Sequence, residues 1–204
     1  MKFTIGLLAA LLILTGCSTN QKLDTATAGP TLLWTDHFNA ISAIKHWQSN
    51  AKIAIKVDSK TQTAKMLWQQ NNDQFNIEFS GPFGQGGFSL RGDNNSVVLN
   101  IAKEAPIKGA KTSKILRERL GWEIPVENAK YWLLGIPSPL TKSRATLKDE
   151  RLTALIQDGW NISYPKYKKV GNHYLPTRIV ISKDKLNFLI VIYQWNTQLD
   201  ATQS

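Results

Sequence analysis

The chain has 204 residues, a formal net charge of +10 at pH 7 and a single cysteine. One cysteine excludes an internal disulfide, and this length is enough for one domain with its own hydrophobic core. The excess of basic residues favours anionic membrane headgroups or an acidic protein as a partner. The alternative is that the lysines only keep the protein soluble, since most of them are spread along the chain.

Residues 1–16 have the features of an export signal. Lys2 precedes an apolar run that is too short to span a membrane, and the run ends in Leu14-Thr15-Gly16-Cys17. This order resembles the lipobox of bacterial lipoproteins, in which the cysteine becomes the acylated first residue of the mature chain. We therefore expect lipid attachment at Cys17. A chance cysteine after an ordinary signal peptide is the alternative.

Residues 17–30 are expected to form a lipidated N-terminus and a flexible tether, because they are polar and have no periodic apolar pattern. Ser18 stands where an Asp usually retains lipoproteins in the inner membrane of enteric-type bacteria, so we expect the outer membrane. Export also excludes nucleic acid as a partner. The remaining residues, 31–204, are predicted to form one domain.

The first half of this domain is predicted to contain one helix followed by strands. Phe38, Ile41 and Ile44 recur at three-residue steps, which predicts an amphipathic helix from Thr35 to about Lys45. Alternating apolar and polar residues predict five strands joined by short turns, at residues 52–57, 64–69, 75–80, 88–90 and 97–101. This succession is typical of an antiparallel meander.

Between the third and fourth of these strands lies Gly81-Pro82-Phe83-Gly84. Phe83 is a bulky apolar residue in a loop of turn-forming residues, with nothing local to bury against. Its partner is the core of the protein, another protein or the hydrocarbon of a membrane.

Two helices and a second set of strands are predicted in the rest of the chain. Gly121 and Gly135 are typical helix ends, which places the helices at 111–120 and 126–134. Asp158-Gly159 and Lys183-Asp184-Lys185 are turn signals between strands. The strands are predicted at 144–147, 152–157, 160–164, 178–181 and 187–195.

Residues with the spacing of a catalytic or metal site are not apparent in the sequence. The histidines, His37, His46 and His173, lie far apart, and the adjacent Asp149 and Glu150 lie in a predicted turn. The glycines around Phe83 lie between two strands, whereas a phosphate loop leads from a strand into a helix. We therefore expect no enzyme activity, no metal and no cofactor.

Large apolar residues are abundant, with seven Trp, seven Phe and five Tyr. One interpretation is a barrel filled by its own side chains. The other is a sheet that bends without closing and holds an apolar cavity capped by the helices at 111–134. The candidate lining residues of that cavity are Met66, Trp68, Phe79, Leu99 and Trp132.

Motifs along nearly the whole chain resemble those of the LolB family of outer-membrane lipoprotein receptors. They include Trp68-Gln69-Gln70, Gly81-Pro82-Phe83-Gly84 and Gly159-Trp160. They also include the segment from Tyr131 to Pro137, which contains Trp132. The resemblance implies a mainly β (α+β) fold, an unclosed antiparallel β-barrel of about ten or eleven strands with capping helices. It also implies that the loop at Gly81, Pro82, Phe83 and Gly84 faces the membrane, where the family carries an exposed leucine.

The same resemblance implies a function. The protein would accept lipoproteins from the periplasmic carrier LolA into its hydrophobic cavity and insert them into the outer membrane, without nucleotide hydrolysis. Its partners would be LolA, the acyl chains of cargo lipoproteins and the outer membrane, and it would act as a lipid-anchored monomer on the periplasmic face. The alternative is a structural lipoprotein with a filled barrel that supports an envelope complex.

Overall fold

The computed structural model describes residues 30–81 and 87–197. In this part of the chain eleven strands form one antiparallel sheet, in the order β6-β5-β4-β3-β2-β1-β11-β10-β9-β8-β7. β6 and β7 are the two edges and do not pair with each other, so the sheet bends without closing. The prediction of an unclosed antiparallel barrel is confirmed.

In the described residues, one helix precedes six strands, and two further helices separate these from the last five strands. The helices are α1 (Pro30–Ser42), α2 (Thr112–Leu120) and α3 (Val126–Leu134). The strands of the first half are β1 (His46–Val57), β2 (Lys60–Asn71), β3 (Gln74–Ser80), β4 (Gly87–Gly92), β5 (Val97–Ile101) and β6 (Ile107–Gly109). Those of the second half are β7 (Ser143–Lys148), β8 (Arg151–Gln157), β9 (Trp160–Val170), β10 (His173–Lys183) and β11 (Leu186–Asn196).

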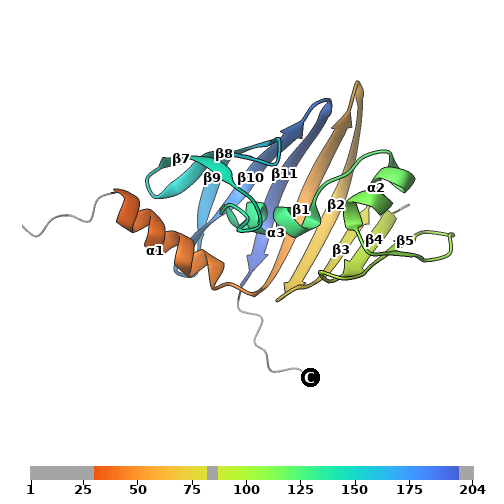
Figure 1. Ribbon diagram of the computed structural model, residues 1–204, viewed down its shortest axis with the longest axis horizontal. Helices are drawn as coiled ribbons and strands as arrows, with labels where there is room; N and C mark the ends of the chain where they lie inside the picture. The colour runs from red at the N-terminus through yellow and green to blue at the C-terminus, as the bar shows by residue number, and fades with distance from the viewer. Residues whose placement is uncertain (1–29, 82–86, 198–204) are drawn as a thin grey trace, which may run out of the picture.

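All three helices cover the same face of the sheet, which we call the inner face (Figure 1). Alternation along the strands places apolar side chains there. In β1, Ile53 and Ile55 are buried, whereas Lys52 and Lys56 are exposed on the opposite, outer face. Cross-strand neighbours repeat this pattern, so the hydrophobic core lies between the inner face and the helices.

Two-residue turns join most neighbouring strands of the sheet. Their first residues include Asp58, Asn72, Asp158 and Asp184, each with a positive φ of 51 to 52°. Asp and Asn tolerate this left-handed conformation better than other side chains, and its twist matches that of the strands. The turn predicted at Asp158-Gly159 is confirmed, as is the one at Asp184.

Several boundaries differ from the sequence prediction. α1 begins at Pro30, within the segment assigned to the tether, since proline is favoured in the first turn of a helix. β9 and β10 continue beyond their predicted ends through Pro165 and Pro176. Proline argues against a strand, but here the pairing of β9 with β10 is irregular after Pro176, which accommodates it. β6 was not predicted because three residues are too few to show an alternation.

α3 is hydrogen-bonded to the sheet by Asn128, which donates to Asp158 at 2.7 Å, and through the buried amide of Gln157 in β8. Its Oε1 accepts hydrogen bonds from Trp132 Nε1 at 2.8 Å and from the Ser138 backbone N–H at 3.0 Å. Its Nε2 donates to the carbonyl oxygens of Ser138 and Thr141, both at 2.8 Å. The helix and the loop after it are therefore held against the sheet at a fixed position.

Candidate functional site: an apolar cavity on the inner face

A cavity of about 390 Å³ lies between the inner face and the segment that ends α2. Phe79, Phe88 and Ile101 line it from neighbouring strands, and Leu120 and Trp122 line it from the helix side. Its lining also includes the polar residues Gln62, Thr63 and Arg119. This volume is within the range of roughly 300–1,000 Å³ that is typical of small-ligand sites. The site is therefore large enough for an apolar ligand, and its lining is suited to one.

The strand register explains why these side chains meet. Met66, Phe79, Phe88 and Ile101 occupy one cross-strand row on β2 to β5. Phe79 and Phe88 stack with their ring centroids 4.4 Å apart. Gly81 and Gly87, next to the end of β3 and at the start of β4, also line the cavity and have no side chain to fill it.

Aromatic rings continue from the cavity along the inner face. The ring centroids of Phe88 and Trp122 are 6.2 Å apart, and Trp122 makes an edge contact with Phe188 at a centroid distance of 5.5 Å. Phe188 then contacts Trp160, which contacts Trp132 of α3. The inner face is packed around Trp132 and Trp160, which are almost fully buried, whereas beside α2 it holds the cavity.

The five predicted lining residues all face inward, but they differ in position. Phe79 lines the cavity. Met66, Trp68, Leu99 and Trp132 are buried in the packed core, each with at most 4% of its surface exposed. Trp68 donates its Nε1 hydrogen to Gln70 at 2.9 Å, and Trp132 donates to Gln157. A contact of these four residues with cargo stays a prediction.

Phe88, Leu120 and Trp122 were not among the predicted lining residues. Phe88 had a usable signal, because it continues the strand alternation on the same face as Phe79. Trp122 follows Gly121, the left-handed residue that ends α2, so its direction depends on how the chain leaves the helix. No periodic pattern predicts that direction.

Two predicted sites fall outside the described residues. Cys17 precedes them, and Pro82, Phe83 and Gly84 lie between the two described segments; Gly81 is the last residue before that gap. Lipid attachment and the membrane-facing loop therefore stay predictions.

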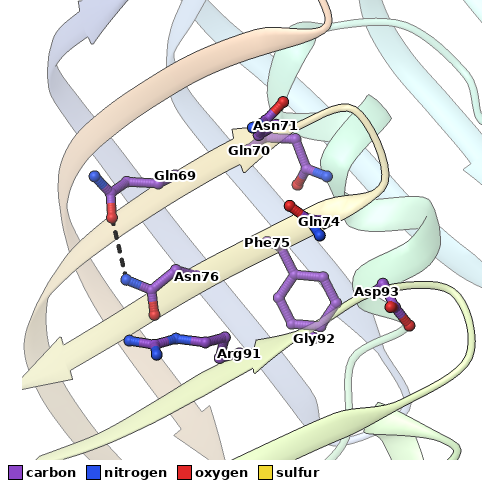
Figure 2. A pocket seen from close by; sticks show the side chains of 9 residues that line it. All are labelled: Gln69, Gln70, Asn71, Gln74, Phe75, Asn76, Arg91, Gly92 and Asp93. Carbon is purple, nitrogen blue, oxygen red and sulfur yellow. Dashed lines mark hydrogen bonds between the residues drawn. The ribbon is translucent and has the colours of Figure 1, made fainter. Parts of the chain in front are cut away.

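A second groove, of about 490 Å³, has a different character. It lies at the turn end of β2, β3 and β4 and is lined by Gln69, Gln70, Asn71, Gln74, Phe75, Asn76, Arg91, Gly92 and Asp93. Figure 2 shows its amide groups, among which Asn76 Nδ2 donates to Gln69 Oε1 at 3.1 Å. Its amide groups need hydrogen-bonding partners, while Phe75 and the aliphatic parts of the other side chains make much of its surface apolar, so this groove suits a ligand with both polar and apolar groups.

Titratable groups near the core show no arrangement for proton transfer. Burial raises the pKa of Tyr164 well above its usual value, and burial also raises the pKa of Tyr167, so both phenols are neutral. Tyr167 donates its hydroxyl hydrogen to the Leu152 carbonyl at 2.9 Å. Asp149 and Glu150 are exposed in the turn between β7 and β8, as expected. Within residues 30–81 and 87–197, no three His, Asp or Glu side chains lie close enough to hold a metal ion.

No helix of the described segments is both long and apolar enough to cross a membrane. The fold itself, an unclosed sheet with helices over one face, is similar to that of solved structures. A LolA superfamily protein from Nitrosomonas europaea superposes with a TM-score of 0.56 at 10% identity, over 83% of this chain and 93% of that one. A DUF1329 family protein from Desulfovibrio piger superposes with a TM-score of 0.60 at 9% identity, over 86% and 93%.

Sequence similarity gives the family within this fold. The family described as outer membrane lipoprotein LolB matches residues 45–195. An outer-membrane lipoprotein LolB of Pseudomonas syringae is 32% identical over 185 residues, 90% of each chain. Another, of Pseudomonas aeruginosa, is 32% identical over 191 residues, 92% of each chain. The chain belongs to the LolB family of outer-membrane lipoproteins, as its motifs predicted.

Proposed function

We propose that this protein receives lipoproteins from the carrier LolA and inserts them into the outer membrane. In this proposal Cys17 is acylated and residues 17–30 tether the domain to the periplasmic face of that membrane as a monomer. The cavity beside α2 takes up the acyl chains of the cargo. The main support is the cavity itself, because Phe79, Phe88, Ile101, Leu120 and Trp122 line it with apolar surface and it is large enough for part of an acyl chain.

The proposed transfer is passive. Each methylene that water contacts costs about 0.8 kcal/mol, so acyl chains move from one apolar site to another and not through water. The carrier would release the chains into this cavity, and the bilayer would then take them because it is the larger apolar phase. These steps need no nucleotide hydrolysis and no covalent chemistry, in line with a receptor that is not an enzyme.

Ala64→Phe tests the cavity. Ala64 lies on β2 and lines the cavity, so a phenyl ring there would occupy the space meant for a chain. If the ring displaces three methylenes, binding should weaken by about 2.4 kcal/mol, roughly 50-fold. The measurement is the equilibrium binding of a fluorescent palmitoylated lipopeptide to the purified chain.

The matched control is Ala54→Phe, which places the same ring on the outer face of the neighbouring strand β1. It should leave lipopeptide binding unchanged. Equal binding by the Ala64→Phe variant and the native chain would contradict the assignment of the cavity. The alternative, a filled structural lipoprotein, predicts no lipopeptide binding by any of the three proteins.

A further inference from the structure

The outer face of the sheet carries a row of cations that only the strand register brings together. Lys166 of β9 pairs with Arg178 of β10, and Lys52 of β1 pairs with Lys65 of β2. Val191 of β11 lies between the two pairs, opposite both Arg178 and Lys52. All four cations are exposed. We call these five residues the basic row.

The basic row is unfavourable for the folded protein by itself. Like charges directly opposite each other on neighbouring strands destabilise a sheet. Glu78 is the one Asp or Glu within the eleven described strands, and it pairs with Leu67 and Ser89, outside this row. The ion pairs of the described residues lie elsewhere, with Asp58, Asp73, Glu118, Glu123 and Asp149 as their acids. Among the described residues, then, no acid pairs with the row, and its charge is available to an anionic partner.

Exposed apolar side chains adjoin the basic row at its centre. Val191 is 37% exposed and Tyr193, two residues further along β11, is 59% exposed. Together with Lys52, Thr63 and Lys65 they line a groove of about 550 Å³ on the outer face. Tyrosine beside lysine is the composition of a membrane interface, where the ring lies at headgroup depth and the ammonium reaches the phosphates.

The groove on the outer face and the cavity on the inner face meet beside the end of β3. Thr63, Ala64 and Gly81 line both of them, from opposite faces. A surface that binds the outer face next to Gly81 would therefore lie beside the opening of the cavity. A bilayer surface is extended enough to contact a row that crosses five strands and also to reach the end of β3.

We propose that the basic row with Tyr193 binds the surface of an anionic phospholipid bilayer. This orients the sheet with its outer face toward the lipid and its helices away from it. The proposal extends the proposed function and does not depend on cargo transfer. Each lysine near an anionic membrane surface strengthens binding by about fivefold.

The experiment measures the partitioning of the full chain onto lipid vesicles. The chain carries Cys17→Ala so that no acyl group contributes, and the vesicles are phosphatidylcholine with or without phosphatidylglycerol. Residues 1–16 are the same in every variant, so their contribution cancels when variants are compared. The native row should favour the phosphatidylglycerol vesicles, and added salt should reduce that preference.

Lys52→Gln combined with Lys65→Gln should lower this preference by about 25-fold. The matched control is Lys111→Gln with Lys114→Gln, which removes the same charge from exposed residues at the start of α2 on the inner side. It should change the preference by less than about threefold. Tyr193→Ser should weaken binding to both kinds of vesicle, since the ring contacts the interface whatever the headgroup charge.

Three results would overturn the proposal. They are equal losses in the two double variants, no preference of the parent chain for phosphatidylglycerol, and a row variant that binds vesicles normally but fails to bind LolA. The last would assign the row to an acidic protein. Thermal unfolding of each variant checks folding, and Lys52→Gln should not lower the melting temperature, because it removes a like-charge pair.

Discussion

Replacing Gln157 by Leu should weaken the attachment of α3 to the sheet, to which Asn128 also contributes through its hydrogen bond to Asp158. Gln157 is 1% exposed and makes four hydrogen bonds, two as acceptor and two as donor. Leucine has similar bulk but no polar atom. The substitution therefore leaves the Nε1–H of Trp132 and the backbone N–H of Ser138 without their partner in a buried site.

The cost follows from these two donors. A buried donor that loses its partner costs about 1–3 kcal/mol, so the two together cost about 2–6 kcal/mol. Burial of the apolar leucine side chain stabilises the folded state by about 1 kcal/mol and offsets part of this cost. The expected loss, about 1–5 kcal/mol, is a large part of the 5–15 kcal/mol that stabilises a typical domain. The two carbonyl groups add less, because each retains a second lone pair for other partners.

Urea unfolding, followed by far-ultraviolet circular dichroism, measures this free energy. Gln69→Leu is the matched control, since Gln69 lies in β2 and is exposed on the outer face with amide partners only. It should change the free energy of unfolding by less than about 0.5 kcal/mol. A loss below about 1 kcal/mol for Gln157→Leu, or one equal to that of the control, would refute the reasoning.

Three further predictions concern the helix ends, pH and the loop. Gly121 and Gly135 have φ of 73° and 80°, but a Cβ at Gly121 meets nothing within 4 Å, whereas one at Gly135 lies 2.9 Å from Pro176. Gly121→Ala should therefore cost about 1 kcal/mol in urea unfolding and Gly135→Ala clearly more; equal costs would contradict the contact. Burial, and then Arg151, lowers the pKa of His37, so the unfolded chain binds a proton more readily. Stability should fall as the pH drops below about 6.5, and His37→Gln should abolish that loss in unfolding at several pH values; an unchanged slope would exclude this histidine. Phe83→Glu should leave lipopeptide binding intact but abolish delivery to liposomes, while Phe83→Leu should deliver normally; delivery by the Phe83→Glu variant would defeat the loop assignment.

Local patterns predicted the fold well, because each strand reports its buried face by alternation. Ile53 and Ile55 alternate with lysines, and α3 was predicted with its observed bounds, since Gly135 ends it. The arrangement of the sheet into an unclosed barrel came from the resemblance to a family. Alternation says which side of a strand is buried but does not fix how far a sheet curves.

The position of the cavity could not be predicted from these local patterns. Phe79 and Trp132 have the same apolar character in the sequence, yet one lines a cavity and the other is packed in the core. The difference arises from how each helix lies on the sheet. Trp132 belongs to α3 and packs against Trp160 and Gln157 of the sheet, whereas the segment after α2 leaves space beside Phe79.

The basic row could not be predicted from the sequence either. Lys52, Lys65, Lys166 and Arg178 are widely separated along the chain, which is why scattered lysines indicated only solubility. Register along β9, β10, β11, β1 and β2 places them side by side. Long-range pairing, and not composition, makes them a surface.

Site-specific photo-crosslinking during transfer tests the central claim most directly. A photoreactive residue replaces Phe88 in the cavity or, as a control, Leu67 on the outer face of β2. LolA loaded with an acyl-labelled lipoprotein is then added. The account predicts a crosslink between position 88 and the acyl chain and none from position 67. Acyl chains that reach the membrane with no crosslink at position 88 would contradict it.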